Sequence, residues 1–234
     1  MLSVHWNDHN HEKGKPMISL PEMPARIARL HKDRRGYPVP AFVCWFKDGQ
    51  PCPRGEGEPD FRVIAPGYLS RAYQHSRCWI CGDELGVHRV FTIGPMCVVN
   101  RVTSEPPSHR ACAEFAAKAC PFLTNPREKR SVKDLPENGT VAGIHLDRNP
   151  GAVCLYETRI AQPFRAGSGY LFRLGEPDNI DWYALGRPAT RAEILASIES
   201  GYPLLQREAV KDGPEAVAEL CRMRDAAMTL LPAA

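Results

Sequence analysis

The hydrophobic and polar positions in the first half of the chain predict short elements separated by long connections. Pro24 stands at the start, and Gly36 just past the end, of a segment with apolar residues on one side, which favours a helix. Segments rich in Val, Phe and Trp are typical of strands. We therefore expect a helix over 24–35, strands over 39–46 and 61–64 joined by a loop over 47–60, and a helix over 66–75.

The pattern in the second half predicts strands followed by helices. Turn-forming residues at 163–168 and 175–178 separate three apolar segments, which indicates an antiparallel meander. Thr190 and Glu193 have the spacing of a capping box, and Gly201 is expected to end the helix that follows. The expected strands are 152–159, 169–174 and 179–183, and the expected helices are 190–201, 203–211 and 214–231. The two halves together predict an α+β fold with C-terminal helices.

The composition is that of a globular protein with many loops. Of the 234 residues, 43% are hydrophobic and 24% are charged, which is ordinary for a packed domain. The 22 prolines are nearly twice the usual share of about 5%, which favours short elements. The net charge of +3 is too small to indicate nucleic-acid binding by itself.

The cysteines and the apolar segments indicate the cellular compartment of the protein. Nine cysteines are an odd number, and the N-terminus is too polar for a signal peptide. Nor does any apolar run approach the about 18 to 20 residues that a bilayer span needs. We therefore expect a cytoplasmic protein without membrane contact, whose thiols bind metal or pack instead of forming disulfides.

Changes in composition divide the chain into three regions. Residues 1–16 are polar and are expected to be disordered. Residues 17–126 are expected to form a zinc-binding region, and residues 140–234 an antiparallel β region with helices. A basic, polar linker separates the two, and we place the boundary within 126–140.

Two pairs of metal-binding residues carry the clearest chemistry. Cys78 and Cys81 lie on either side of two residues and precede Gly82, so that two thiolates on a tight turn can face one ion. His109 and Cys112 have the same spacing at the start of a helical segment, which puts them on one face. Four such ligands favour tetrahedral zinc, and because they leave no open position, the zinc is expected to be structural. Cys97 and Cys120 are the alternative ligands if His109 points away.

The arrangement around these ligands is similar to a treble-clef zinc finger. The knuckle at Cys78 is followed by segments 87–93 and 96–102, which can pair as a hairpin around Gly94 and Pro95, and then by the helix that carries His109. Knuckle, hairpin and helix are the parts of that finger. The resemblance implies a zinc centre in the N-terminal half.

A second resemblance covers most of the chain from about residue 39 onward. The phrases Ile-Gly-Pro-Met-Cys-Val-Val-Asn-Arg at 93–101, Pro-Pro-Ser-His-Arg-Ala-Cys-Ala at 106–113 and Cys-Pro-Phe-Leu at 120–123 look like stretches of uncharacterised bacterial and bacteriophage proteins. This likeness implies a phage or prophage origin and a role in host takeover or in countering defence. It transfers no activity and no functional residue.

Three functions are compatible with these features: nucleic-acid binding, protein binding by a zinc-stabilised module, and nuclease activity. A zinc-stabilised accessory protein can bind a host protein or nucleic acid without catalysis, and this is the function we expect. The alternative is a metal-dependent nuclease or other hydrolase related to HNH enzymes, for which His88 and Asp83 are the nearby candidates, although no Asp-His pair is present. Separately, His145 and Asp147 could form an acid-base pair or a Mg²⁺ site, but a surface strand end is the favoured interpretation. The residues expected to contact nucleic acid flank the zinc ligands and are Arg89, Arg101, Arg110, Arg127, Lys129 and Arg130.

Overall fold

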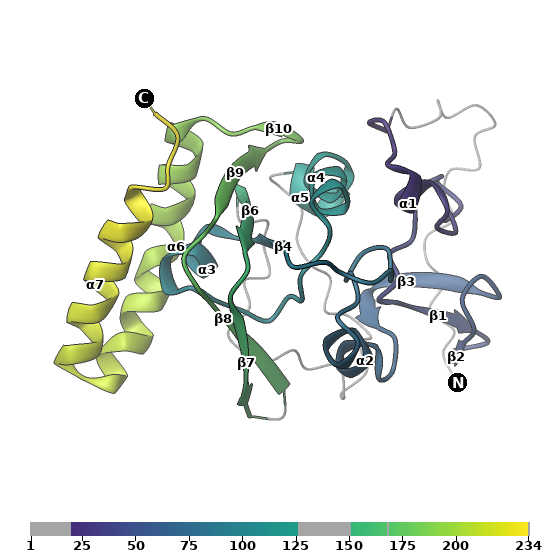
Figure 1. Cartoon of the computed structure of the whole chain (residues 1–234), viewed down its shortest axis with the longest axis horizontal. Coiled ribbons are helices and arrows are strands. Elements are labelled where there is room, and N and C mark those ends of the chain that lie inside the picture. The colour runs from purple at the N-terminus through teal and green to yellow at the C-terminus, as the bar shows by residue number, and fades with distance from the viewer. Residues whose placement is uncertain (1–19, 126–150, 168, 234) are drawn as a thin grey trace, which may run out of the picture.

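The structure is a computed structural model that describes residues 20–125, 151–167 and 169–233. It confirms an α+β fold with antiparallel sheets and two long C-terminal helices (Figure 1). The basic residues Arg127, Lys129 and Arg130, the pair His145 and Asp147, the segment 1–16 and the expected boundary over 126–140 lie outside the described residues. Of the helices that the structure describes, none combines the length and the apolar character that a bilayer span requires.

The N-terminal part holds a small sheet in the order β2-β1-β3. Val39, Val43 and Trp45 form its buried cluster. The expected loop over 47–60 is wrong in part, because it contains β2 and the start of β3, and the strands are joined by tight turns at Gly49 and Gly55, both with positive φ. The elements here are α1 (Ala25–Ala28), β1 (Val43–Lys47), β2 (Gln50–Cys52), β3 (Glu58–Ile64) and α2 (Tyr68–Gln74).

The first helix is much shorter than the expected 24–35. It ends after Ala28, and the Asp33 carboxylate then accepts hydrogen bonds from the amides of Arg35 and Tyr37, each at 2.9 Å. An aspartate that binds nearby amides stabilises a turn in place of a helix. Gly36, with φ of +89°, completes this turn instead of closing a helix.

The central sheet has the order β10-β9-β6-β4 and joins residues from both sides of the 126–150 segment. β4 (Arg89–Ile93) pairs antiparallel with β6 (Val153–Thr158), and β6 pairs with β9 (Asn179–Ala184), which pairs with β10 (Arg187–Pro188). Figure 1 shows this sheet between α4 (Arg110–Ala119) on one side and the C-terminal helices on the other. The strands β4 and β6 are therefore buried on both faces.

The expected hairpin over 87–102 is wrong. β4 is followed by α3 (Pro95–Asn100), whose N-cap is Gly94. Proline at the first helical position loses no hydrogen bond and has a helical φ, so Gly94 and Pro95 start a helix instead of turning a hairpin. Arg101, in the left-handed region, ends that helix, and the short β5 (Val102–Thr103) joins a different sheet.

A third sheet has the order β5-β8-β7 and corrects the expected meander. The segment expected as a turn at 163–168 belongs largely to β7 (Ala161–Ala166), which forms a hairpin with β8 (Gly169–Leu174). This hairpin leaves the central sheet at Ile160 and returns at Gly175, whose amide donates to the Ile160 carbonyl. β6 and β9 can therefore pair directly.

The C-terminal helices form one antiparallel pair, α6 (Arg191–Asp212) and α7 (Pro214–Met228). The capping box is present, because the Glu193 amide donates to Thr190 and the Thr190 amide donates to the Glu193 carboxylate. The expected break at Gly201 is wrong: the helix continues through Pro203. A Cβ at Gly201 would lie 2.8 Å from a Met96 side-chain atom, so the glycine serves close packing against α3.

Candidate metal centre

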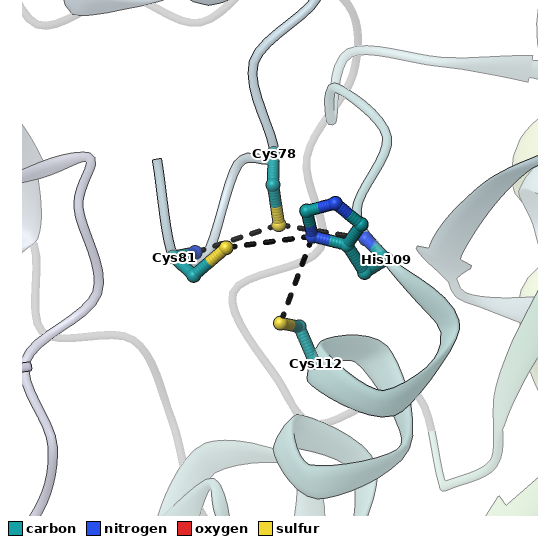
Figure 2. Close-up of side chains that lie close together, drawn as sticks. All are labelled: Cys78, Cys81, His109 and Cys112. Carbon is teal, nitrogen blue, oxygen red and sulfur yellow. Dashed lines mark hydrogen bonds between the residues drawn. The ribbon is translucent and has the colours of Figure 1, made fainter. Parts of the chain in front are cut away.

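The four predicted ligands Cys78, Cys81, His109 and Cys112 lie together (Figure 2). Their three sulfurs and one imidazole nitrogen all fall within 4.8 Å of one another. The predicted alternatives Cys97 and Cys120 are not part of this cluster. The arrangement can therefore hold a metal ion with the first-choice set of ligands.

The cysteine knuckle follows α2 and is held by its own backbone. The Gly82 amide donates to the Cys78 carbonyl at 2.9 Å, and the Cys78 amide donates to the Asp83 carbonyl at 2.7 Å. Gly82 has a φ of +81°, a conformation in which a side chain is strained. The Cys81 amide points at the Cys78 sulfur at 3.4 Å, as an amide does when it stabilises a thiolate.

The second pair of ligands comes from the start of α4. His109 is its N-cap residue and Cys112 lies in the first turn. The preceding Ser108 exchanges two backbone hydrogen bonds with Val90 of β4. The central sheet therefore fixes the position of this helix end. On the knuckle side, the Trp79 amide donates to the Pro107 carbonyl at 3.0 Å.

The imidazole of His109 is oriented for metal binding through Nδ1. This atom lies 3.4 Å from the Cys81 sulfur and 4.0 Å from the Cys112 sulfur. The other ring nitrogen, Nε2, lies 2.9 Å from the Glu84 carbonyl oxygen, to which it donates as N–H. Such a bond selects the tautomer whose Nδ1 lone pair is free, as is usual for metal-binding histidines.

The donor set fits a tetrahedral ion in its spacing. A zinc ion about 2.3 Å from sulfur and about 2.0 Å from nitrogen separates its ligand atoms by about 3.5–3.8 Å. The sulfur–nitrogen distances of 3.4 and 4.0 Å lie close to that range. Because all four positions are protein atoms, a metal here has no open position for water or substrate.

The charge state of the thiols also favours a cation. Cys78 and Cys112 are fully buried and Cys81 nearly so. Hydrogen bonds from the thiols of Cys112 and Cys81, and from two backbone amides, hold the pKa of Cys78 well below its usual range. Hydrogen bonds to Cys78 and Cys81 raise the pKa of Cys112 far above its usual range. The thiolate form is thus favoured at Cys78 over Cys112, and a divalent ion would stabilise the thiolate form of all three sulfurs.

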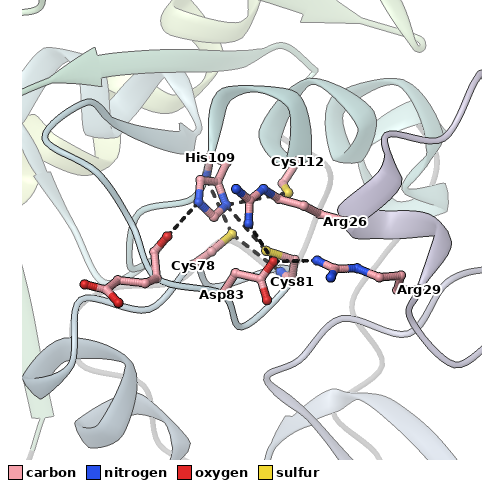
Figure 3. A network of polar contacts seen from close by, with 8 residues as sticks. Arg26, Arg29, Cys78, Cys81, Asp83, His109 and Cys112 are labelled. Carbon is pink, nitrogen blue, oxygen red and sulfur yellow. Dashed lines mark hydrogen bonds and ion pairs between the residues drawn. The ribbon is translucent and has the colours of Figure 1, made fainter.

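An apolar and ionic layer surrounds the ligands. Ile27, Ile80 and Phe115 pack with the cysteines in one small cluster. Arg26 and Arg29, on and just after α1, both bind the Asp83 carboxylate, at 2.6 and 2.7 Å (Figure 3). These ion pairs hold α1 against the cysteine knuckle, although the two segments do not belong to one sheet or one helix.

The predicted nucleic-acid contacts are in different environments. The Arg110 guanidinium binds Glu157 at 3.0 Å and also binds Asp181, and Arg101 binds Glu176. Arg89 is half-buried on β4 and lines a cavity. The structure therefore does not gather the described arginines into one free basic surface.

A histidine–carboxylate pair, missed by the sequence reasoning, lies beside the centre. Nδ1 of His88 lies 3.2 Å from the Glu157 carboxylate. Asp83, the other nearby candidate named for a nuclease, binds Arg26 and Arg29 instead. Glu157 is far away in the chain and reaches His88 only because β4 pairs with β6, so no local pattern could have revealed it.

Comparison of the chain with protein-family models, with curated proteins and with solved structures found no match in any of the three.

Proposed function

We propose that the chain is a zinc-stabilised binding protein in which the metal is structural. The closed set of three cysteines and one histidine carries this proposal, because zinc prefers such ligands and a filled tetrahedron leaves no catalytic position. A knuckle and a ligand-bearing helix are two parts of a treble clef. The strand–helix–strand segment over 89–103 stands where that finger has its hairpin.

Metal analysis tests the zinc. Protein purified without added metal should contain one zinc per chain, and Cys81→Ser should lose most of it. Cys221→Ser is the matched control, because Cys221 is an exposed thiol on α7, outside the cluster, and its replacement should leave the zinc content unchanged. Equal metal content in all three proteins would refute the structural zinc.

The partner we propose is a host protein in preference to nucleic acid. A phosphate that bound Arg101 or Arg110 would have to displace carboxylates that already bind these guanidinium groups. The resemblance to phage proteins supports a role in host takeover or in countering defence. Affinity for DNA and RNA across a salt series separates the two partners, because phosphate contacts give a steep salt dependence. A steep slope that is lost with Arg110→Gln would favour nucleic acid.

The hydrolase alternative rests on the His88–Glu157 pair. A histidine oriented by a carboxylate is a common general base. However, Arg110 already binds Glu157 and Asp181, so these carboxylates have a cation without a catalytic metal. Metal-dependent cleavage of plasmid or RNA that disappears in His88→Ala would establish this function in place of the binding role. No cleavage by the wild-type protein would exclude it for these substrates.

A further inference from the structure

A cavity of about 350 Å³ lies on the opposite face of β4 from α4. Its walls come from five parts of the chain: α2 and the residues just after it, Leu85 after the cysteine knuckle, the proline pair before His109, β4, and the β7–β8 hairpin. The volume matches the lower end of the usual range for small-molecule sites. It is large enough for one aromatic ring and its substituent.

Aromatic side chains form much of the wall. Phe91 and Phe172 pack with ring centroids 5.9 Å apart, and Tyr73 meets the Phe172 ring at 6.3 Å. Tyr73 is 45% exposed although it belongs to this ring cluster, so part of its face is available at the cavity. Such walls favour a flat apolar group, which can pack face to face or edge to face.

One charged side chain lines the cavity, and it is Arg89. It shares a face of β4 with Phe91, two positions along the strand. In the described part of the chain, Arg89 has no carboxylate within ion-pair distance, in contrast to Arg101 and Arg110. A guanidinium against apolar walls attracts an anion such as a carboxylate or phosphate, two of whose oxygens it can bind through two parallel hydrogen bonds. Gln74 and Ser76 supply further polar groups on the α2 side.

We propose that this cavity binds a small aromatic acid, with the ring against the exposed part of Tyr73 and the anionic group on Arg89, while Phe91 and Phe172, 0% and 4% exposed, are buried behind the lining. Ring and anion together use both kinds of wall that the cavity offers. A carboxylate on a free aromatic acid and a phosphate on a nucleotide share this chemistry. The site needs neither the metal nor a macromolecular partner, so it is independent of the proposed function.

Ligand titration followed by NMR on the full-length chain tests the proposal. The probes are benzoate and thymidine monophosphate, each beside its neutral counterpart, benzamide and thymidine. At least one acid should bind saturably and about 10-fold or more tighter than its neutral counterpart, since a charge-assisted hydrogen bond contributes at least that ratio. Preference for benzoate assigns a free aromatic acid as the ligand, and preference for the monophosphate assigns a nucleotide.

Two variants locate the binding. Arg89→Gln should abolish the preference for the acid while weak binding of the neutral ring remains. Arg173→Gln is the control, because Arg173 lies on the outer face of β8 over the Phe164 ring, and it should bind like the wild type.

Three results would overturn the proposal. The first is that neither acid binds more tightly than its neutral counterpart. The second is that the preference for the acid survives Arg89→Gln in a protein whose amide spectrum is that of the wild type, and the third is that Arg173→Gln abolishes this preference equally. The amide spectrum of each variant also shows whether the fold is retained. If Arg89→Gln does not fold, Arg89→Lys is tested in its place. That variant keeps the charge but loses the planar fork and should show a reduced preference.

Discussion

The region around the metal centre and the region around the C-terminal helices are stabilised in different ways. In the second, a large buried cluster joins β4, β6 and β8 to α3, α6 and α7, with residues such as Tyr156, Ile194 and Ile198 fully buried. In the first, the buried cluster is small, and three of its members are the cysteines that face one another. The large cluster can stabilise its region by burial of apolar surface alone.

This difference shows what a metal would contribute here. The knuckle, α1 and the start of α4 are joined by few backbone hydrogen bonds and by exposed ion pairs, which are individually weak. A structural zinc contributes folding free energy to the segment that binds it. We therefore expect two parts of one chain that respond differently to metal and to core mutations.

The largest effect is expected from loss of a metal ligand. Cys112→Ser should lower the zinc content well below one per chain, because it removes one of the four ligands. The effect on folding should be large, since structural zinc sites contribute about 10–16 kcal/mol of apparent binding free energy. Amides of the knuckle and of the first turn of α4 should then lose protection in hydrogen exchange, whereas those of β6 should keep it. Equal loss of protection in both regions would show that the two regions do not depend differently on the metal.

Ile194→Ala tests the other region. Ile194 is fully buried in the large cluster, so the variant should lose about 2–5 kcal/mol of unfolding free energy in urea. Its zinc content should stay at the wild-type value. Ile160→Ala is the control, because Ile160 is 59% exposed and its removal should change stability by less than about 0.5 kcal/mol. Loss of zinc from the Ile194 variant would mean that the two regions unfold together.

Arg110 joins the two regions, since it starts α4 and binds carboxylates of β6 and β9. Arg110→Met should cost about 1 kcal/mol of unfolding free energy, a value reduced by the partial exposure of the side chain. Zinc should be retained. Combining it with Glu157→Gln in a double-mutant cycle measures the coupling, and a coupling energy of zero would show that this ion pair contributes nothing to the junction.

The smallest effect concerns the capping box of α6. The bond from Arg187, with those from Thr190, lowers the pKa of Glu193 from 4.5 to about 2. A carboxyl with a depressed folded pKa stabilises the protein fully above pH 4.5 and loses this contribution as the pH falls to about 2. Glu193→Gln should therefore flatten the pH dependence of stability in that window by about 1 kcal/mol, without changing zinc content. An unchanged pH profile would contradict this assignment.

Local patterns predicted the features that depend on near neighbours. The spacing of Cys78 and Cys81, and that of His109 and Cys112, follows from the reach of side chains on a turn and on a helix. The capping box at Thr190 is equally local. The α+β class also followed from the periodicity of short apolar segments.

Other predictions were wrong because a competing interaction was overlooked. The Asp33 side chain ends the first helical segment early by binding nearby amides. Pro95 suits a helix start better than a hairpin turn. Gly201 and Pro203 disfavour a helix locally, but packing of α6 against α3 outweighs them.

Each pair of the candidate metal cluster was thus readable from the amino-acid order, since each pair lies within one turn of chain, whereas the meeting of the two pairs depends on backbone contacts between distant segments. The pairing of β4 with β6 was not, because it joins strands distant in the sequence and depends on which faces are buried. That pairing brings Glu157 to His88 and Arg110, and packing of the β7–β8 hairpin beside α2 leaves Arg89 in its cavity. The spacing of ligands within one turn is a local property of the chain. Whether an arginine is paired with a carboxylate or lines a cavity depends on the whole fold.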